Sequence, residues 1–184
     1  MKRTLKLILV VAVLGVGSLL AWAATDTALH ITSDAQFCGS CHSMKPMQAS
    51  FLQSSHGGLS STGTRALCTD CHLPQDSYVD YLYMKARNGA WDVMKEFVLG
   101  ADDVDWHAKR ALAHEFVYES GCLKCHNDLQ RGSERSSKQF VAHKPYFLGT
   151  VKDTCITCHK VGHADLTAAL NQHFGAQPNA SNNK

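Results

Sequence analysis

All eight cysteines of this 184-residue chain occur in one motif, which the sequence repeats four times. Each motif has two cysteines separated by two residues, and a histidine follows directly; the four read CGSCH, CTDCH, CLKCH and CITCH. The cysteines are Cys38, Cys41, Cys68, Cys71, Cys122, Cys125, Cys155 and Cys158, and the histidines are His42, His72, His126 and His159. In this signature the two thiols bond to the vinyl groups of a haem and the adjacent histidine reaches the iron. We therefore predict four covalently bound haem c groups.

Two other uses of paired cysteines compete with this interpretation. Four C-x-x-C pairs could form two zinc ribbons, and paired disulfide loops are possible in an exported chain. Neither alternative explains a histidine after every pair. Haem also accounts for the lean supply of core residues, with 7 Phe, 5 Tyr and 3 Trp in the chain, because porphyrin rings would replace apolar side chains in the core.

The overall charge makes one class of partner unexpected. The chain has 18 Lys and Arg against 16 Asp and Glu, a formal net charge of +2. Such a balance gives no strongly basic face, so no nucleic-acid partner is predicted.

The N-terminus carries a predicted membrane segment. Three basic residues precede an uncharged run from Leu7 to Ala24, which spans roughly 27 Å as a helix against about 30 Å for the hydrocarbon layer. The positive-inside rule then predicts a single-pass protein of the bacterial inner membrane, with a cytoplasmic N-terminus and the remainder in the periplasm. A cleaved signal peptide is the alternative, since residues 21–23 (AWA) fit a cleavage site, but the apolar run exceeds the usual signal length. Both interpretations export residues 25–184.

The motifs form an internal repeat. The interval between the second and third motifs is longer than the other two intervals, which divides the chain into two dihaem halves at about 38–72 and 122–159. His56 precedes Cys68 by the same interval by which His143 precedes Cys155. This equal spacing predicts equivalent roles as distal iron ligands, the alternative being surface histidines near a haem.

Five further histidines lie outside the motifs and this repeat. His163 follows the fourth motif closely enough to reach a neighbouring haem. His107 and His114 are two helical turns apart on an expected helix and share a face; one could be a ligand, and otherwise they lie at the surface or a haem edge. His30 and His173 are assigned structural roles.

The segment 77–99 predicts a helix that could line a quinol site. Lys85 and Asp92 are two helical turns apart, so they share a face. Tyrosines and a tryptophan around them are residue types of the membrane interface. A quinol releases two electrons and two protons, and a carboxylate or lysine can accept a proton from its hydroxyl. The alternative is an ordinary amphipathic helix packed on haem.

The sequence predicts a mainly α fold with little regular structure, in which one N-terminal transmembrane helix precedes a tetrahaem domain of two dihaem halves. Residues 1–24 form the membrane anchor or an uncleaved signal, 25–174 the tetrahaem cytochrome c domain, and 175–184 a disordered tail. The polar, Ser-rich segment 127–142 predicts a mobile loop.

Several of these segments, in this order, resemble one family. They are CGSCHSM, SSH, CTDCHLP, KARNG, CLKCH and CITCHKVGH, following one N-terminal membrane helix, and they extend to about residue 166. This resembles the NapC/NirT family of membrane-anchored tetrahaem quinol dehydrogenases. Because Asp92 follows the lysine of KARNG by two helical turns, the chain most resembles the type that forms the small subunit of cytochrome c nitrite reductase.

The resemblance implies roles for residues around the first haem. Met44 matches the position that supplies an axial ligand in the nitrite-reductase type, and His42 would then be freed or loosely engaged. Asp92 matches a carboxylate near the open face of that haem. Lys85 matches a basic residue that lines the quinol pocket.

The resemblance also implies ligand pairs for the other three haems. These are His72 with His163, His126 with His56, and His159 with His143. His143 matches a histidine that only some members have; in members without it, a partner protein can complete the fourth haem.

The function implied is oxidation of quinol, with menaquinol as the donor, and relay of electrons to a periplasmic multihaem reductase. The implied partner is the catalytic subunit of cytochrome c nitrite reductase, with which the chain could form an oligomer. Alternatives are a quinol dehydrogenase for nitrate reductase or another periplasmic reductase, and a soluble periplasmic multihaem electron shuttle. A multihaem enzyme with its own substrate is a third class.

Overall fold

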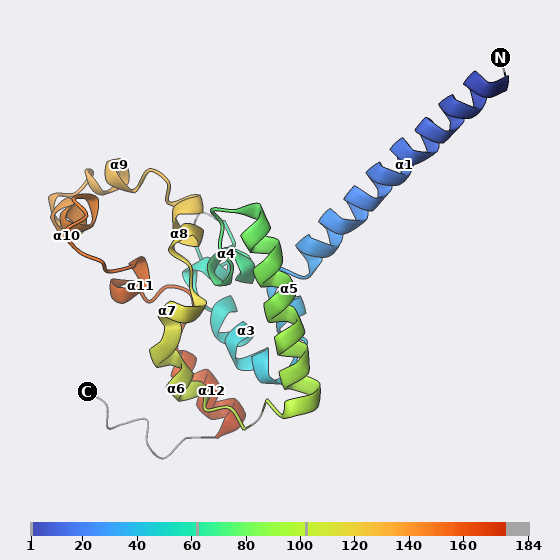
Figure 1. Cartoon of the computed structure of the whole chain (residues 1–184). Coiled ribbons are helices and arrows are strands. Elements are labelled where there is room, and N and C mark those ends of the chain that lie inside the picture. Colours follow the sequence, from blue (N-terminus) through green and yellow to red (C-terminus); the bar gives the residue numbers. More distant parts are fainter. Residues whose placement is uncertain (1, 62, 102, 176–184) are drawn as a thin grey trace.

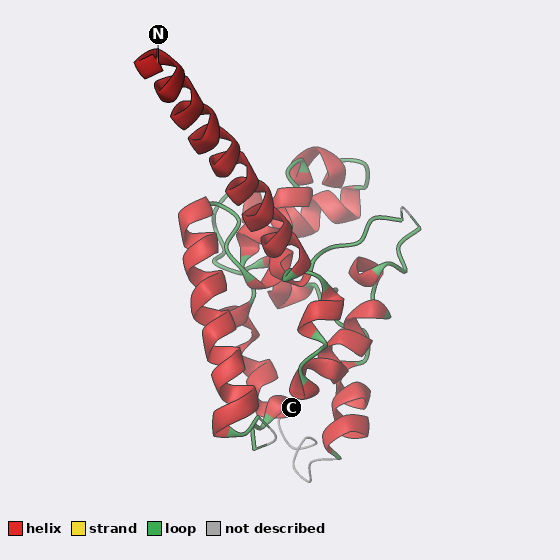
Figure 2. Ribbon diagram, turned by 90° about the vertical axis from the view of Figure 1, so that its right-hand side faces the viewer, coloured by secondary structure: helices red, strands yellow, loops and turns green. Residues whose placement is uncertain are grey.

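The structure is a computed structural model that describes residues 2–61, 63–101 and 103–175, and it contains no strand within those ranges (Figure 2). A long first helix projects from a bundle of short helices and connecting loops (Figure 1). The prediction of a mainly α fold with one N-terminal apolar helix is confirmed. The elements are α1 (Lys2–Ile31), α2 (Ala35–Cys38), η1 (His42–Met44), α3 (Lys45–Leu52), η2 (Ser55–Gly57), α4 (Cys68–His72), α5 (Tyr78–Met94), η3 (Lys95–Leu99), α6 (Trp106–Lys109), η4 (Arg110–Leu112), α7 (Ala113–Phe116), α8 (Glu119–Cys125), α9 (Leu129–Ser133), α10 (Ser137–Phe147), α11 (Cys155–Cys158) and α12 (Leu166–Phe174).

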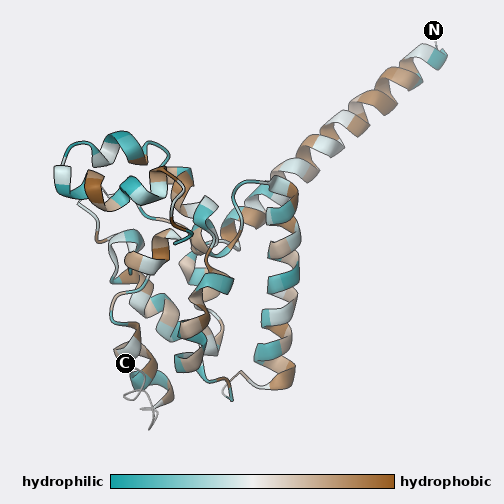
Figure 3. Ribbon diagram, turned by 60° about the vertical axis from the view of Figure 1, so that its left-hand side comes forward, coloured by the Kyte–Doolittle hydropathy of each residue, from teal (hydrophilic) through white to brown (hydrophobic). Residues whose placement is uncertain are grey.

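Helix α1 is the apolar segment that the sequence predicts. Its mean hydropathy reaches 2.5 over an 18-residue window, none of that window is buried, and its length is sufficient to cross a membrane (Figure 3). The hydroxyl groups of Ser18, Thr25 and Thr27 donate to carbonyls one turn earlier, which satisfies them within the helix. The helix continues to Ile31, so the expected boundary at residue 24 marks the end of the apolar run rather than the end of the helix.

Helix α5 confirms the helix predicted over 77–99. Ser77 caps it, with its hydroxyl accepting from the Asp80 amide at 3.3 Å. The helix continues into the π-helical turn η3 and ends at Gly100, whose φ of 80° favours glycine. Together α5 and η3 form one rod beside the foot of α1 (Figure 1).

Helix α12 returns the end of the described chain to the first motif by packing on α3. The Ser50 hydroxyl donates to the Ala164 carbonyl at 2.7 Å, and the Ala164 amide donates back to the Ser50 carbonyl at 3.0 Å. Phe51 and Leu170 are buried in this contact region, with 5% and 0% of their surface exposed. Apart from glycines, the other buried apolar residues in the described ranges are Ala35, Leu73, Ala101 and two prolines, Pro46 and Pro74, so the side chains alone make a small core.

The segment 127–142 is not the loop that its composition predicted. It contains α9 and the first half of α10, and these two helices pack on each other. The serines that suggested a loop lie at helix boundaries, where they are favoured: Ser136 precedes α10 in extended conformation and Ser133 ends α9. The predicted tail lies outside the described residues except for Gly175.

Helices α4 and α8, which carry the second and third motifs, approach closely at Gly121. A Cβ atom at this position would overlap the Asp70 carbonyl oxygen. The Tyr118 amide donates to the Cys71 carbonyl at 2.9 Å beside this contact. The missing side chain of Gly121 therefore sets how near the two motifs can lie.

Gly121→Ala is expected to destabilise the protein by about 1–3 kcal/mol, lowering the unfolding midpoint by roughly 2–10 °C, because backbone atoms must move. The midpoint is measured by circular dichroism on the purified haem-loaded protein. Gly89→Ala is the matched control, since Gly89 is also helical and has open space around its Cβ position. That control should be neutral or gain up to about 1 kcal/mol. Equal midpoints for the two variants would contradict the packing argument.

Candidate functional site

The backbone around the paired cysteines is helical in three of the motifs and differs in the first. In α4, α8 and α11 the paired cysteines are three positions apart within a helix, so both thiols lie on one face. In the first motif the helix ends at Cys38, and Cys41 has extended backbone. The intervening Gly39 packs against the end of the Gln48 side chain.

The alternatives to haem find no support in this arrangement. All eight cysteines are free thiols. Within residues 2–61, 63–101 and 103–175, no group of three or more His, Cys, Asp or Glu is placed to hold a metal ion. Haem attachment needs only the thiol pair and the adjacent histidine, which all four motifs supply.

Three motif histidines each face a histidine from elsewhere in the chain. Ring centres are 6.3 Å apart for His72 and His163, 6.3 Å for His56 and His126, and 5.9 Å for His143 and His159. A metal–imidazole bond is about 2 Å long, so two imidazoles on opposite sides of one metal ion have centres roughly 6 Å apart. The three pairs therefore have the separation that bis-histidine ligation of an iron requires, and they are the pairs that the resemblance implies.

Hydrogen bonds fix the tautomer of four of these rings. Nδ1 of His72 lies 2.8 Å from the Phe116 carbonyl and Nδ1 of His163 lies 3.1 Å from the Met47 carbonyl. The same contact joins His56 to Val161 at 3.3 Å and His143 to Gln139 at 2.9 Å. A carbonyl only accepts, so Nδ1 carries the proton in all four rings and Nε2 keeps its lone pair. This is the orientation that a metal-ligating histidine needs.

The environment of His163 also favours its neutral form. Burial, with a smaller contribution from nearby His72, lowers the pKa of His163 to about 4. A neutral imidazole is the form that coordinates a metal, so His163 is in the protonation state that an iron ligand needs.

The equal spacing of His56 and His143 does not give them equivalent neighbours. His143 faces His159, the histidine of the motif that follows it, but His56 faces His126 in the other half of the chain. His163 of the second half faces His72 of the first. The two halves are thus interleaved in space.

The motifs are contiguous in chain order. The first two meet where the Cys38 thiol hydrogen-bonds to Cys68, which lowers the pKa of Cys38 and raises that of Cys68. Burial, and then nearby Cys122, raises the pKa of the Cys71 thiol to about 11, which marks the contact of the second and third motifs. The fourth joins through Cys155, whose Sγ lies 3.4 Å from the Glu119 carboxylate at the start of α8.

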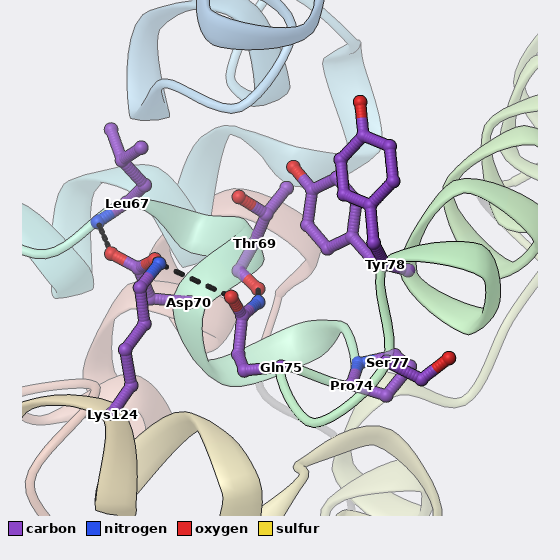
Figure 4. A pocket seen from close by; sticks show the side chains of 9 residues that line it. Leu67, Thr69, Asp70, Pro74, Gln75, Ser77, Tyr78 and Lys124 are labelled. Carbon is purple, nitrogen blue, oxygen red and sulfur yellow. Dashed lines mark hydrogen bonds and ion pairs between the residues drawn. The ribbon is translucent and has the colours of Figure 1, made fainter.

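An ion pair joins the second motif to the third, through residues that lie between the two cysteines of each motif (Figure 4). Lys124 of CLKCH donates to Asp70 of CTDCH at 2.7 Å and to the Gln75 amide oxygen at 3.1 Å. The Asp70 side chain is 16% exposed and also accepts from the Leu67 amide at 2.8 Å. Sequence reasoning missed this pair, although the charges at matching motif positions were its signal.

A cavity of about 620 Å³ adjoins the last two motifs. Its lining includes Cys125, His126, His143 and His159, with the basic side chain of Arg135 at its wall. This volume is in the range of cofactor sites, and an arginine suits the carboxylates that a haem carries.

The Lys85 side chain is held at the foot of α1. Its Nζ donates to the Ser33 hydroxyl at 2.8 Å, and Ser33 donates to the Leu29 carbonyl in the last turns of α1 at 2.6 Å. Tyr81 Oη lies 3.2 Å from the same hydroxyl. Because Ser33 already donates to Leu29, Tyr81 is the donor in this contact. Lys85 is thereby fixed where the apolar helix meets the bundle.

Asp92 lies on the same helix as Lys85 and faces the first motif. Partial desolvation raises the pKa of its carboxyl, although much of the side chain is accessible to solvent. Burial and then the carboxylates of Glu96 and Asp92 raise the pKa of the Cys41 thiol, so both carboxylates are neighbours of that motif. A carboxyl with a raised pKa is better suited to accept a proton near neutral pH.

Glu96 is a residue of this site that sequence reasoning missed. Its carboxylate accepts from the Ser43 hydroxyl at 2.6 Å and from the His42 backbone amide. These hydrogen bonds lower the pKa of Glu96 despite partial desolvation. Its position one turn after Asp92 was the available signal, since residues four apart share a helix face.

The family profile described as "NapC/NirT cytochrome c family, N-terminal region" matches residues 1–167. The chain belongs to the NapC/NirT cytochrome c family. Its four CxxCH motifs are thus haem c attachment sites of a tetrahaem electron-transport protein, and α1 is the anchor of a single-pass inner-membrane protein.

Individual relatives agree with this assignment. The chain is 36% identical over 165 residues to the cytochrome c-type protein TorY of Escherichia coli O157:H7, covering 84% of this chain but 42% of TorY. It is 31% identical to the tetraheme c-type cytochrome CymA of Shewanella oneidensis, over 85% of this chain and 87% of CymA. It is 30% identical to NrfH of Wolinella succinogenes, over 74% and 72%. The chain thus spans less than half the length of TorY but most of CymA and NrfH.

A solved structure shares the fold. The crystal structure of the cytochrome c nitrite reductase NrfHA complex bound to the HQNO inhibitor aligns with a TM-score of 0.52 and 23% identity. The alignment covers 90% of this chain and 92% of that one. The interleaved helical arrangement is therefore a fold that a solved protein adopts.

Replacing His163 with Ala is expected to convert one of the four haems from low spin to high spin while leaving its covalent attachment intact, because the cysteines of every motif remain. Electron paramagnetic resonance measures the spin state, and the pyridine haemochrome assay measures haem content. His30→Ala, at an exposed position of α1, is the matched control. An unchanged spectrum of the His163 variant would show that the pairing with His72 is not ligation.

Proposed function

We propose that this protein oxidises menaquinol at the foot of α1 and relays the electrons to a periplasmic terminal reductase. The observation that carries the proposal is the hydrogen-bond chain from Lys85 through Ser33 to Leu29 of α1. It ties a titratable side chain next to the first motif to the membrane helix itself, where a lipid-soluble quinol is available. Exposed tyrosine and tryptophan side chains on α5, Tyr78, Tyr83 and Trp91, suit the membrane interface.

Quinol oxidation needs groups that take up protons beside the electron acceptor. When bound, haem c supplies a one-electron acceptor that takes no proton. Asp92, with its raised pKa, accepts the proton of one quinol hydroxyl and, being accessible to solvent, passes it to water before it accepts the second hydroxyl proton. Lys85 orients the quinol by hydrogen bonding, since Ser33 and Tyr81 hold its ammonium in place. Glu96 fixes the first motif against this helix face through Ser43.

The proposed ligand pairs are His72 with His163, His126 with His56, and His159 with His143. Their support is the ring separations together with the Nδ1–carbonyl hydrogen bonds. The contiguous motifs provide a route from the foot of α1 to α11, which lies on the opposite side of the bundle (Figure 1).

The proposed partner is the catalytic subunit of cytochrome c nitrite reductase. Support comes from the shared fold with a chain of the NrfHA complex and from the similarity to NrfH. The higher identity to TorY favours a second candidate, a different periplasmic reductase with the same quinol chemistry. Purification from membranes, with identification of the reductase that accompanies the chain, separates the two.

The proposed orientation has the N-terminus in the cytoplasm and the haem domain in the periplasm, because Lys2, Arg3 and Lys6 precede the apolar run. Retention of α1 is part of the proposal. Its support is that the helix runs without a break through residues 21–23 and that its final turns hold Ser33. The proposed soluble region begins at residue 25, within the last turns of α1.

Asp92→Asn and Lys85→Leu are expected to slow reduction by a menaquinol analogue about 10- to 100-fold, because proton acceptance or positioning is lost. Dithionite-driven reduction and haem content should stay unchanged, since neither residue attaches haem. The measured quantity is the ratio of quinol-driven to dithionite-driven reduction rates. Asp80→Asn is the control, an exposed carboxylate in the first turn of the same helix. Ratios equal to wild type in both variants would refute the quinol-site proposal.

Removal of residues 1–24, with a cleavable signal supplied in their place, should release a soluble domain that carries four haems. It should accept electrons from dithionite but lose most quinol oxidation, because the donor dissolves in the membrane. The same two assays measure both properties. Full quinol activity in the soluble form would contradict a membrane-adjacent site.

A further inference from the structure

Helix α5 and the π-helical turn η3 present one apolar face that no part of the described chain covers. Six apolar side chains recur along this rod at intervals of three or four residues, so they form one stripe, the α5 stripe: Val79, Tyr83, Ala86, Ala90, Val93 and Phe97. All six are exposed, with 73% of Val79, 64% of Tyr83 and 76% of Phe97 accessible to solvent. A continuous apolar face of this length on a folded surface marks an interaction site.

Hydrogen bonds on the other side of the rod keep the α5 stripe directed outward. Tyr81 and Lys85 both contact the Ser33 hydroxyl, at 3.2 and 2.8 Å, just after the end of α1. Further along the rod, the Glu96 carboxylate accepts from the Ser43 hydroxyl in η1 at 2.6 Å. The rod is therefore attached at two places, and the stripe cannot rotate into the bundle unless these contacts break.

The rod lies on the side of the bundle that faces the membrane helix. In three views from different directions, α5 and η3 form the edge of the bundle toward which α1 projects (Figures 1, 2 and 3). Helix α1 is the membrane anchor, and its apolar window is wholly exposed. A bilayer that contains α1 is therefore next to the edge that carries the α5 stripe.

The side chains beside the α5 stripe are of the types that favour the boundary between lipid and water. Trp91 is 57% exposed, and the Lys95 ammonium lies 6.0 Å from the centre of its ring. Arg87 is exposed one turn before Trp91, on the same side of the helix. Basic side chains keep their charge among lipid headgroups while their stems cover apolar surface, and tryptophan is enriched at the same depth. An apolar stripe with a basic and aromatic flank is the pattern of a helix that lies in a membrane surface.

We propose that α5 and η3 lie in the surface of the membrane that holds α1, with the α5 stripe directed into the lipid. The occupant of the face is the acyl boundary of a phospholipid bilayer, in which such a helix buries its apolar side by about 5–10 Å. The chain thus has two membrane contacts, one transmembrane helix and one interfacial helix. This goes beyond the proposed function, because it concerns how the whole domain lies on lipid and holds whether or not quinol is the donor.

Two membrane contacts fix the orientation of the haem domain. A domain attached only through α1 could turn about that helix, whereas a second contact along α5 prevents the turn. Lys85 and Asp92 belong to the same helix, so they stay at one depth relative to the lipid.

The experiment labels the full-length, haem-loaded protein from the lipid side. The protein is placed in nanodiscs of phosphatidylethanolamine and phosphatidylglycerol, one copy per disc, with a diazirine that partitions into the acyl chains and forms a carbene on illumination. Peptide mass spectrometry locates the label, which we expect on the apolar run of α1 and on the α5 stripe. Val141 in α10 and Leu148 directly after it are the matched controls and should stay unlabelled. They are 66% and 64% exposed but lie on the part of the bundle away from α1 (Figure 1).

Phe97→Glu tests the face itself. A charge at this exposed position should remove the label from η3, while the label on α1, the haem content and the unfolding midpoint stay unchanged. Val141→Glu is the control variant and should change none of these quantities. If Phe97→Glu yields too little protein, the wild-type comparison with Val141 and Leu148 decides.

Three results would overturn the assignment. One is label on the α5 stripe that does not exceed the label at Val141 and Leu148. The second is unchanged label on η3 in Phe97→Glu. The third is a stripe that stays unlabelled in single-copy discs but is shielded from a water-soluble carbene precursor when two copies share a disc, because that result assigns the face to a second copy of the chain.

Discussion

The fold depends on histidines outside the CxxCH motifs whose rings face the motif histidines, because the chain itself buries so little apolar surface. In the described residues the buried apolar side chains are Ala35, Phe51, Leu73, Ala101 and Leu170, with two prolines, Pro46 and Pro74. A domain of this size held together by such a core would be marginal. Instead of a large apolar core, the structure contains a set of histidine pairs. Backbone carbonyls accept hydrogen bonds from Nδ1 of four of these rings. In the proposed ligation, the porphyrins held between these rings form the interior of the protein.

This constraint explains how distant segments are used. The carbonyls of Met47 and Val161 hold His163 and His56, so the turn after the fourth motif and the helix after the first are locked to each other. The close approach at Gly121 and the Asp70–Lys124 ion pair fix the second motif to the third. The same packing delivers α12 to the first motif. In the proposed ligation, the relay of electrons and the stability of the fold therefore rest on the same contacts.

The sequence predicted the chemistry better than the arrangement. Four CxxCH motifs identify haem attachment because covalent chemistry needs those residues side by side. The apolar run and the 77–99 helix were predicted because periodicity and length are local properties. Their equal spacing from the next motif predicted equivalent roles for His56 and His143. In the structure His143 faces the histidine of that next motif, whereas His56 faces His126 in the other half of the chain. The polar composition of residues 127–142 predicted a loop, but the segment contains α9 and the start of α10, which pack on each other. Ser33 acts through tertiary contacts that no local pattern shows, whereas the position of Glu96 one turn after Asp92 was a local signal whose partner, Ser43, only the structure reveals.

The central claim is that four haems, clamped by these histidines, form the core and a continuous route away from the membrane helix. An anomalous difference map at the iron edge, from crystals of the full-length haem-loaded protein, tests it most directly. The account predicts four iron peaks in chain order of the motifs. Three of them should lie between His72 and His163, between His126 and His56, and between His159 and His143. Fewer than four peaks, or a peak between different histidines of these six, would contradict it.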